Sequence, residues 1–133
     1  MHHLFFSWLL QVRTGFFEGK NRIDSLITEL SNWGASAVTI HGRSRQQRYS
    51  KLANWDYIYQ CARKAPDVLP VLGNGDVLSY LDWNRHKADC PELATCMIAR
   101  GALIKVCIFL CFDYPQHPPT FVLNFSFFSN KLT

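Results

Sequence analysis

The sequence predicts an α/β fold in which helices cover a parallel sheet, and three observations lead to this expectation. Short apolar segments rich in β-branched residues alternate along the chain with longer segments whose apolar residues recur at helical spacing. Apolar strands that alternate with helices are typical of parallel sheets. The length of 133 residues suits one domain, and hydrophobic and charged fractions of 48% and 18% are those of a globular chain.

The first two predicted strands enclose an amphipathic helix. Residues 9–13 form a short extended segment that ends before Gly15. Asn21 is then expected to cap a helix, which Gly34 ends in the left-handed conformation. Residues 37–40, Ala-Val-Thr-Ile, are rich in β-branched side chains and form the second strand. The apolar positions of the helix share one face: Ile23, Leu26, Ile27, Leu30 and Trp33.

Two further helices and strands follow. Asn54 or Ser50 is expected to cap the second helix. Residues 69–72 form the third strand, residues 79–88 the third helix and residues 95–99 the fourth strand. The apolar face of the second helix consists of Trp55, Ile58, Tyr59 and Ala62.

This pattern leaves two architectures open. Four strand–helix units fill the chain, whereas a closed (β/α)₈ barrel needs about 250 residues. The sequence therefore predicts either a small open α/β sheet or half of a barrel.

Composition divides the chain into three parts. Residues 1–11 are apolar and uncharged, residues 12–105 are mixed, and residues 106–133 form a Phe-rich tail of unknown structure with two charged side chains. The division predicts that the middle part carries the fold. No internal repeat is found in the sequence.

Charge and cysteine content narrow the function classes. The net charge of +4 is compatible with a polyanionic partner. None of the five cysteines forms a C-x-x-C motif, so we expect no metal site and a reducing, intracellular location, cytoplasmic or nuclear. The N-terminus lacks the features of a signal peptide, and the apolar runs are shorter than the roughly 20 residues of a membrane span. We therefore expect no membrane partner.

Polar and glycine-rich residues follow three of the predicted strands. They are His41-Gly42-Arg43, Gly73-Asn74-Gly75-Asp76 and Arg100-Gly101. Ligands of parallel sheets bind beyond the carboxyl ends of the strands, where glycines and arginines suit an anion. These residues predict a phosphate-bearing ligand across the sheet edge, although each stretch taken alone is also typical of an ordinary turn. The basic loop 44–51 is either a solvated loop or an RNA contact.

Four motifs resemble those of the tRNA-dihydrouridine synthases. In chain order they are R-T-G-x-x-E-G-K-N, V-T-I-H-G-R-S-R-Q-Q-R-Y-S-K-L-A-N-W-D-Y-I, L-P-V-L-G-N-G-D-V-L-S and M-I-A-R-G-A-L. They cover residues 12–105 at the family's spacing. The similarity is greatest to the eukaryotic branch that carries CCCH zinc fingers before its catalytic barrel.

The resemblance implies an FMN-dependent oxidoreductase on a (β/α)₈ TIM barrel. Such enzymes use NAD(P)H to reduce uridine to 5,6-dihydrouridine in tRNA. The expected fold is then a partial barrel, about the last four βα units, between N- and C-terminal ends that do not resemble the family.

The resemblance also assigns roles to residues. His41 would contact the flavin, Asn74, Gly75 and Asp76 would line the cofactor site, and Ala99 and Arg100 would hold the FMN phosphate. The implied RNA contacts are Arg43 and three residues of the basic loop: Arg45, Arg48 and Lys51.

Two departures from the family pattern limit what the resemblance implies. Gln11 occupies the position of a family lysine near the flavin, and the N-x-G-C-P loop with the catalytic cysteine is absent from the sequence. No catalytic residue is therefore assigned, and we expect a truncated form without activity of its own. The alternatives are a non-catalytic RNA-binding fragment and a misfolded truncated product.

Overall fold

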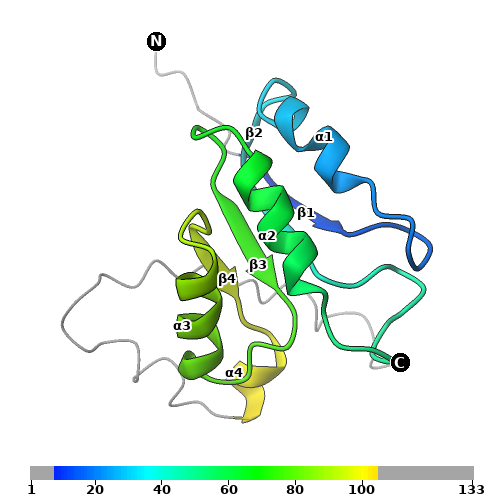
Figure 1. The fold of residues 1–133 in the computed structure, drawn as a ribbon, viewed down its shortest axis with the longest axis vertical. Helices are drawn as coiled ribbons and strands as arrows, with labels where there is room; N and C mark the ends of the chain where they lie inside the picture. The colour runs from blue at the N-terminus through cyan, green and yellow to red at the C-terminus, as the bar shows by residue number, and fades with distance from the viewer. Residues whose placement is uncertain (1–7, 105–133) are drawn as a thin grey trace, which may run out of the picture.

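The computed structural model describes residues 8–104, in which four strands alternate with four helices (Figure 1). Their bounds are β1 Trp8–Arg13, α1 Ile23–Leu30, β2 Ala35–His41, α2 Trp55–Lys64, β3 Val71–Asn74, α3 Tyr80–Asp89, β4 Thr95–Met97 and α4 Arg100–Ile104. Each of the four predicted strands and three predicted helices has its counterpart. The N-terminal residues 1–7 and the predicted Phe-rich tail lie outside the described residues.

The four strands form one parallel sheet in the order β1-β2-β3-β4. In the described part of the chain, β1 pairs only with β2 and β4 only with β3, so this sheet is open. Figure 1 shows α2 between α1 and α3. The prediction of an α/β fold with a parallel sheet is confirmed, and four such units are consistent with part of a barrel.

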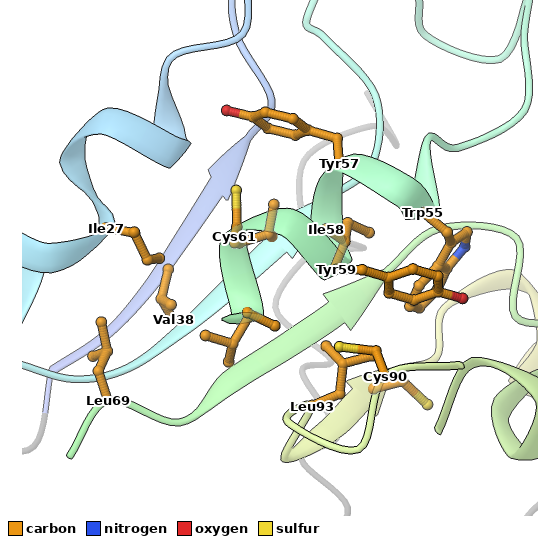
Figure 2. Packing of buried hydrophobic residues seen from close by; sticks show 14 of the residues in the cluster. Ile27, Val38, Trp55, Tyr57, Ile58, Tyr59, Cys61, Leu69, Cys90 and Leu93 are labelled. Atoms are coloured by element: carbon orange, nitrogen blue, oxygen red, sulfur yellow. The ribbon is translucent and has the colours of Figure 1, made fainter. Parts of the chain in front are cut away.

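The core lies between the sheet and its helices. Val38 and Ile40, alternate residues of β2, are fully buried because they face the helices. Figure 2 shows Ile27 of α1 over Val38 and Ile58 of α2 in the same cluster. The apolar face predicted for α2 is buried throughout, which confirms it.

The start of α1 differs from the prediction. Arg22, not Asn21, occupies the N-cap position, and its side chain makes no capping hydrogen bond. Instead, the Tyr57 hydroxyl of α2 accepts a hydrogen bond from the backbone N–H of Asp24 at 2.9 Å and donates one to the Asp24 carboxylate at 2.8 Å. The cap therefore comes from a neighbouring helix, which local sequence signals do not contain.

The end of α1 also differs. The helix stops at Leu30, so Trp33 lies outside it and its side chain is 66% exposed rather than on the buried face. Gly34 has the predicted left-handed conformation, with a φ of 91°, but it lies in the turn after the helix and does not end it.

The remaining boundaries shift by a few residues. Asn54 rather than Ser50 caps α2, accepting from the Tyr57 N–H at 3.0 Å. β3 begins after Pro70, whose carbonyl accepts from the Val38 N–H, and it continues through Gly73 and Asn74. β4 ends at Met97, two residues before the end of the predicted strand, and α4 begins at Arg100. None of the described helices is long and apolar enough to cross a membrane.

Candidate functional site

The carboxyl ends of β2, β3 and β4 meet at one pocket of about 60 Å³. The three strand ends therefore converge, as the sequence predicted. All six residues expected to bind a cofactor line this pocket: His41, Asn74, Gly75, Asp76, Ala99 and Arg100. Their binding role stays a prediction. Arg43, which the sequence also placed at this sheet edge, lines the pocket as well. Sequence reasoning did not assign four further lining residues: Tyr49, Val77, Leu78 and Met97.

Asp76 holds two arginines at the pocket. Both of its carboxylate oxygens accept from Arg43 Nη2 at 2.7 Å, and Oδ1 also accepts from Arg100 Nη2 at 2.9 Å. The backbone N–H of Ala53 donates to Oδ2 at 2.7 Å. Burial raises the pKa of Asp76, but these hydrogen bonds and the two guanidinium charges outweigh it and hold that pKa below the usual value. Asp76 is thus a carboxylate at neutral pH.

Arg43 lies inside the molecule rather than on the surface. Its side chain is 3% exposed, and its Nε donates to the Lys51 carbonyl at 2.6 Å. Its Nη1 is buried without a hydrogen-bond partner in the part of the chain that the structure describes. The buried Arg43 side chain is therefore not accessible for the RNA contact that the sequence predicted. Arg45 and Arg48, which follow it in the β2–α2 loop, are exposed.

Tyr49 connects the basic loop to the pocket. Its ring lies 4.6 Å from Arg100 Cζ and 5.8 Å from Arg43 Cζ, so both guanidinium groups contact the aromatic face. A polar loop residue thereby becomes part of the pocket wall. The sequence feature that could have indicated this role is that Tyr49 is the single aromatic residue in the basic loop.

His41 is a neutral hydrogen-bond donor at neutral pH. Burial lowers its pKa to about 4, and the charges of Arg13 and Arg43 act in the same direction. Nδ1 accepts from the Arg43 backbone N–H at 3.2 Å, so the proton of the neutral ring is assigned to Nε2. The pocket therefore presents two guanidinium groups, one carboxylate and one neutral imidazole.

Comparison with known proteins assigns the chain to a family. The model of the family described as "Dihydrouridine synthase (Dus)" matches residues 8–119. The chain belongs to the dihydrouridine synthase family. This match extends beyond residues 12–105, the range of the motifs, at both ends.

Relatives in plants, animals and fungi show the same similarity. Proteins named tRNA-dihydrouridine(47) synthase (NAD(P)(+))-like in Arabidopsis thaliana and Homo sapiens are 75% and 48% identical to this chain, each over 108 residues. Both alignments cover 81% of this chain and 16% of the relative. The tRNA-dihydrouridine(47) synthase (NAD(P)(+)) of Candida glabrata is 38% identical, with 81% of this chain and 20% of the relative covered. The chain therefore spans a fifth or less of the length of these relatives.

Gln11, where the resemblance implied a lysine, lies beside the pocket in this dihydrouridine synthase family member. Gln11 is in β1 opposite Thr39, and its side-chain amide lies 3.9 Å from the sulfur of Met97, a pocket residue. The glutamine is neutral, so the positive charge at the described site comes from the arginines.

Two glycines, Gly75 and Gly101, permit close approach of the backbone segments around the pocket. Gly75 has a φ of 123°, and a Cβ there would lie 2.6 Å from the Cβ of Ala53. A Cβ at Gly101 would lie 2.6 Å from the carbonyl oxygen of Val77. Both positions require glycine because a side chain would push the pocket loops apart.

Within residues 8–104, no three His, Cys, Asp or Glu side chains lie together as a metal site requires. Cys61, Cys90 and Cys96 are buried free thiols in the core, outside the pocket. Burial raises the pKa of Cys61 to about 11 and that of Cys96 to about 12. These thiols therefore belong to packing rather than to the chemistry of the pocket.

The low pKa of His41 predicts a pH dependence of stability. Because folding lowers this pKa from 6.5 to about 4, the unfolded chain binds the proton more readily between these values. The free energy of unfolding should therefore fall as the pH drops from 6.5 to 4, with about 1–3 kcal/mol attributable to His41. Thermal melting at pH 7 and pH 4.5 should show a smaller loss for His41→Gln than for the parent chain. Equal losses in the two proteins would contradict this assignment, because His86, whose pKa burial also lowers, is present in both.

Proposed function

We propose that this chain supplies the phosphate-binding part of a tRNA-dihydrouridine synthase, which uses FMN and NAD(P)H to reduce uridine to 5,6-dihydrouridine in tRNA. Family membership and the names of the relatives support the reaction. The observation that carries the assignment of the site is the pocket at three strand ends. There Arg100, the neutral His41 and the backbone of Gly75 lie within reach of one small ligand.

The residues of the pocket fit a phosphate monoester. A water molecule needs about 10–15 Å³ of such a cavity, so a volume of about 60 Å³ suits a phosphate group rather than a whole flavin. Two guanidinium groups face one carboxylate, which leaves an excess of positive charge. Arg100 is 48% exposed at its side chain and so open to an incoming anion, while Asp76 fixes its orientation. The buried Nη1 of Arg43 lacks a partner in the described residues and adds a donor beside the same pocket.

Different residues of the pocket would contact different parts of the cofactor. Ala99 and Arg100 would hold the phosphate, Asn74, Gly75 and Asp76 would form the wall behind it, and Nε2–H of His41 would donate toward the flavin. When bound, FMN supplies hydride transfer from NAD(P)H to the uridine. The family's proton-donating cysteine lies in an N-x-G-C-P loop that the 133 residues do not contain, so this chain binds and orients and is expected to be inactive alone.

A second candidate function is a non-catalytic RNA-binding fragment. Arg45, Arg48 and Lys51 are exposed on the β2–α2 loop, and the net charge is +4. A flavin absorbance band in the purified chain favours the enzyme part, whereas steeply salt-dependent tRNA binding without flavin favours the fragment. Recovery only as insoluble material favours a misfolded truncated product. We further propose a reducing, intracellular location, which the three buried free thiols support.

Arg100→Ala tests the phosphate assignment. The substitution removes charge-assisted hydrogen bonds worth about 1.5–3 kcal/mol, so the affinity for FMN should fall about 10- to 100-fold. Riboflavin lacks the phosphate, and its affinity should stay within about twofold in the same fluorescence titration, since no phosphate contact is lost. Asn74→Ala, which removes the hydrogen bond from Asn74 Nδ2 to the Met97 carbonyl at 3.2 Å, should also weaken FMN binding.

Arg85→Ala is the matched control, because Arg85 is exposed on α3 and does not line the pocket. Unchanged FMN affinity in Arg100→Ala, or an equal loss for riboflavin, would refute the placement of the phosphate.

A further inference from the structure

Hydrogen bonds connect two loops beside the pocket. Backbone N–H groups of the β2–α2 loop, residues 42–54, donate to carbonyls of the β1–α1 loop, residues 14–22. The N–H of Arg45 donates to the carbonyl of Gly15 at 3.0 Å, and that of Gln46 donates to the carbonyl of Phe16 at 3.1 Å. The Gln46 side chain also accepts from the Glu18 N–H at 3.4 Å. Both loops follow the carboxyl ends of their strands, the same sheet edge as the pocket.

An aromatic pair is exposed on these loops. Phe16 and Phe17 are 55% and 51% exposed, and their rings are edge to face with centroids 4.7 Å apart. Neither belongs to the hydrophobic core cluster. Single exposed apolar residues are common on proteins, but this pair is held in place by backbone contacts. The pair therefore presents aromatic surface to solvent on a hydrogen-bonded loop.

Cations accompany both rings. Arg45 Cζ lies 5.2 Å from the Phe16 ring centroid, and Lys20 Nζ lies 5.7 Å from that of Phe17. Glu18 is the one acidic residue in the sequence of the two loops, and it forms an ion pair with Lys51. The charge beside the rings is thus positive and is not cancelled by a neighbouring carboxylate.

We propose that Phe16, Phe17, Lys20 and Arg45, here called the Phe16–Phe17 surface, bind an unpaired nucleobase of RNA and the phosphates next to it. Flat aromatic rings stack on bases of any kind, and basic side chains neutralise the backbone, which is the combination that single-stranded nucleic acids require. A base in a duplex already stacks on its neighbours, so the surface selects unpaired nucleotides. The choice of RNA among polyanions rests on the proposed function.

The surface and the pocket share the β2–α2 loop. The exposed Tyr49 of this loop contacts Arg100 at the pocket, and the Lys51 carbonyl accepts from the pocket residue Arg43. An RNA strand that stacks on the Phe16–Phe17 surface can therefore follow this loop toward the pocket. The surface binds nucleotides that flank the target uridine.

A second copy of the chain fits this surface less well than RNA. A two-fold contact would place Lys20 and Arg45 of one copy against the same cations of the other, on chains that each carry a net charge of +4. RNA instead neutralises these charges.

The test is the affinity of the full 133-residue chain for a fluorescently labelled single-stranded RNA decamer, measured by anisotropy. The double variant Phe16→Leu and Phe17→Leu retains apolar bulk but loses both rings, so the dissociation constant should rise about tenfold. Phe16→Trp and Phe17→Trp should retain the parent affinity. The variant Lys20→Gln with Arg45→Gln should flatten the dependence of log K on log salt concentration by about 1.4.

Trp33→Leu is the matched control, because Trp33 is an exposed aromatic residue at the opposite end of the strands and should leave RNA binding unchanged. Unchanged affinity in the Leu double variant would overturn the proposal, as would equal affinity for the decamer in a duplex. A change in sedimentation without a change in RNA affinity would identify a contact between copies and also overturn it.

Titration of the same preparations with FMN separates the two proposals. Suppose that FMN binding depends on Arg100 but RNA binding does not depend on Phe16 and Phe17. This result refutes RNA binding by the Phe16–Phe17 surface and leaves the proposed function standing. Absence of both FMN and RNA binding from a chain that melts cooperatively refutes both proposals.

Discussion

Replacing Asp76 with alanine is expected to lower the free energy of unfolding by about 3–5 kcal/mol. The reason is that Arg43 is 3% exposed and would keep its charge without its carboxylate partner. The substitution also removes the acceptor of the Ala53 N–H and one partner of Arg100. Since domains of this size are stable by about 5–15 kcal/mol, urea denaturation should show a large shift in midpoint.

The exposed ion pair between Lys51 and Glu18 provides the control for Asp76→Ala. Glu18→Ala should change the free energy of unfolding by about 1 kcal/mol or less, because both partners are solvated. The double variant Arg43→Met with Asp76→Leu replaces the buried pair by apolar side chains and should recover much of the stability that Asp76→Ala loses. A double variant as unstable as Asp76→Ala would show that the loss has another cause.

The sheet could be predicted from the sequence because its signals are local. Val38, Thr39 and Ile40 are β-branched, and all three are buried in β2 because side chains of a strand in a covered sheet need no polar alternation. Asn54 caps α2 through its own side chain, three residues from the N–H that it accepts, so this boundary was visible in the sequence. The convergence of His41, Asn74 and Arg100 follows from the parallel order of the strands.

Features that depend on distant residues could not be predicted in the same way. Tyr57 caps α1 from 33 positions away, so no local signal marked that helix start. Arg43 looked like part of a solvated basic loop, and only its partner Asp76, also 33 positions away, draws it inside. α4 has five residues, too few to show a helical period. At the Phe16–Phe17 surface, the Phe16 ring contacts the Arg45 guanidinium of another loop, which spacing along the chain does not reveal.

Trp55→Ala is expected to lower the free energy of unfolding by about 3–5 kcal/mol and to weaken FMN binding. The indole fills the space beside Gly73, where a Cβ would lie 2.4 Å from its ring, and it stacks on His86 with centroids 3.5 Å apart. Its Nε1–H donates to the carbonyl of Gly75 at 2.8 Å. The side chain thus supports the pocket loop from the core side, and its removal leaves both a cavity and an unpaired carbonyl.

Two variants separate these effects of Trp55. Trp55→Phe keeps an aromatic ring but cannot donate to Gly75. It should lower the free energy of unfolding by about 1–3 kcal/mol. It should also weaken FMN binding, although the change in buried volume is small. Trp33→Ala removes an indole that is 66% exposed and should change stability by about 0.5 kcal/mol or less. Denaturant unfolding and FMN titration of Trp55→Ala, Trp55→Phe and Trp33→Ala, each against the parent chain, measure both effects. If Trp55→Phe binds FMN as the parent does, the hydrogen bond to Gly75 does not position the pocket, and Trp55 acts through packing alone.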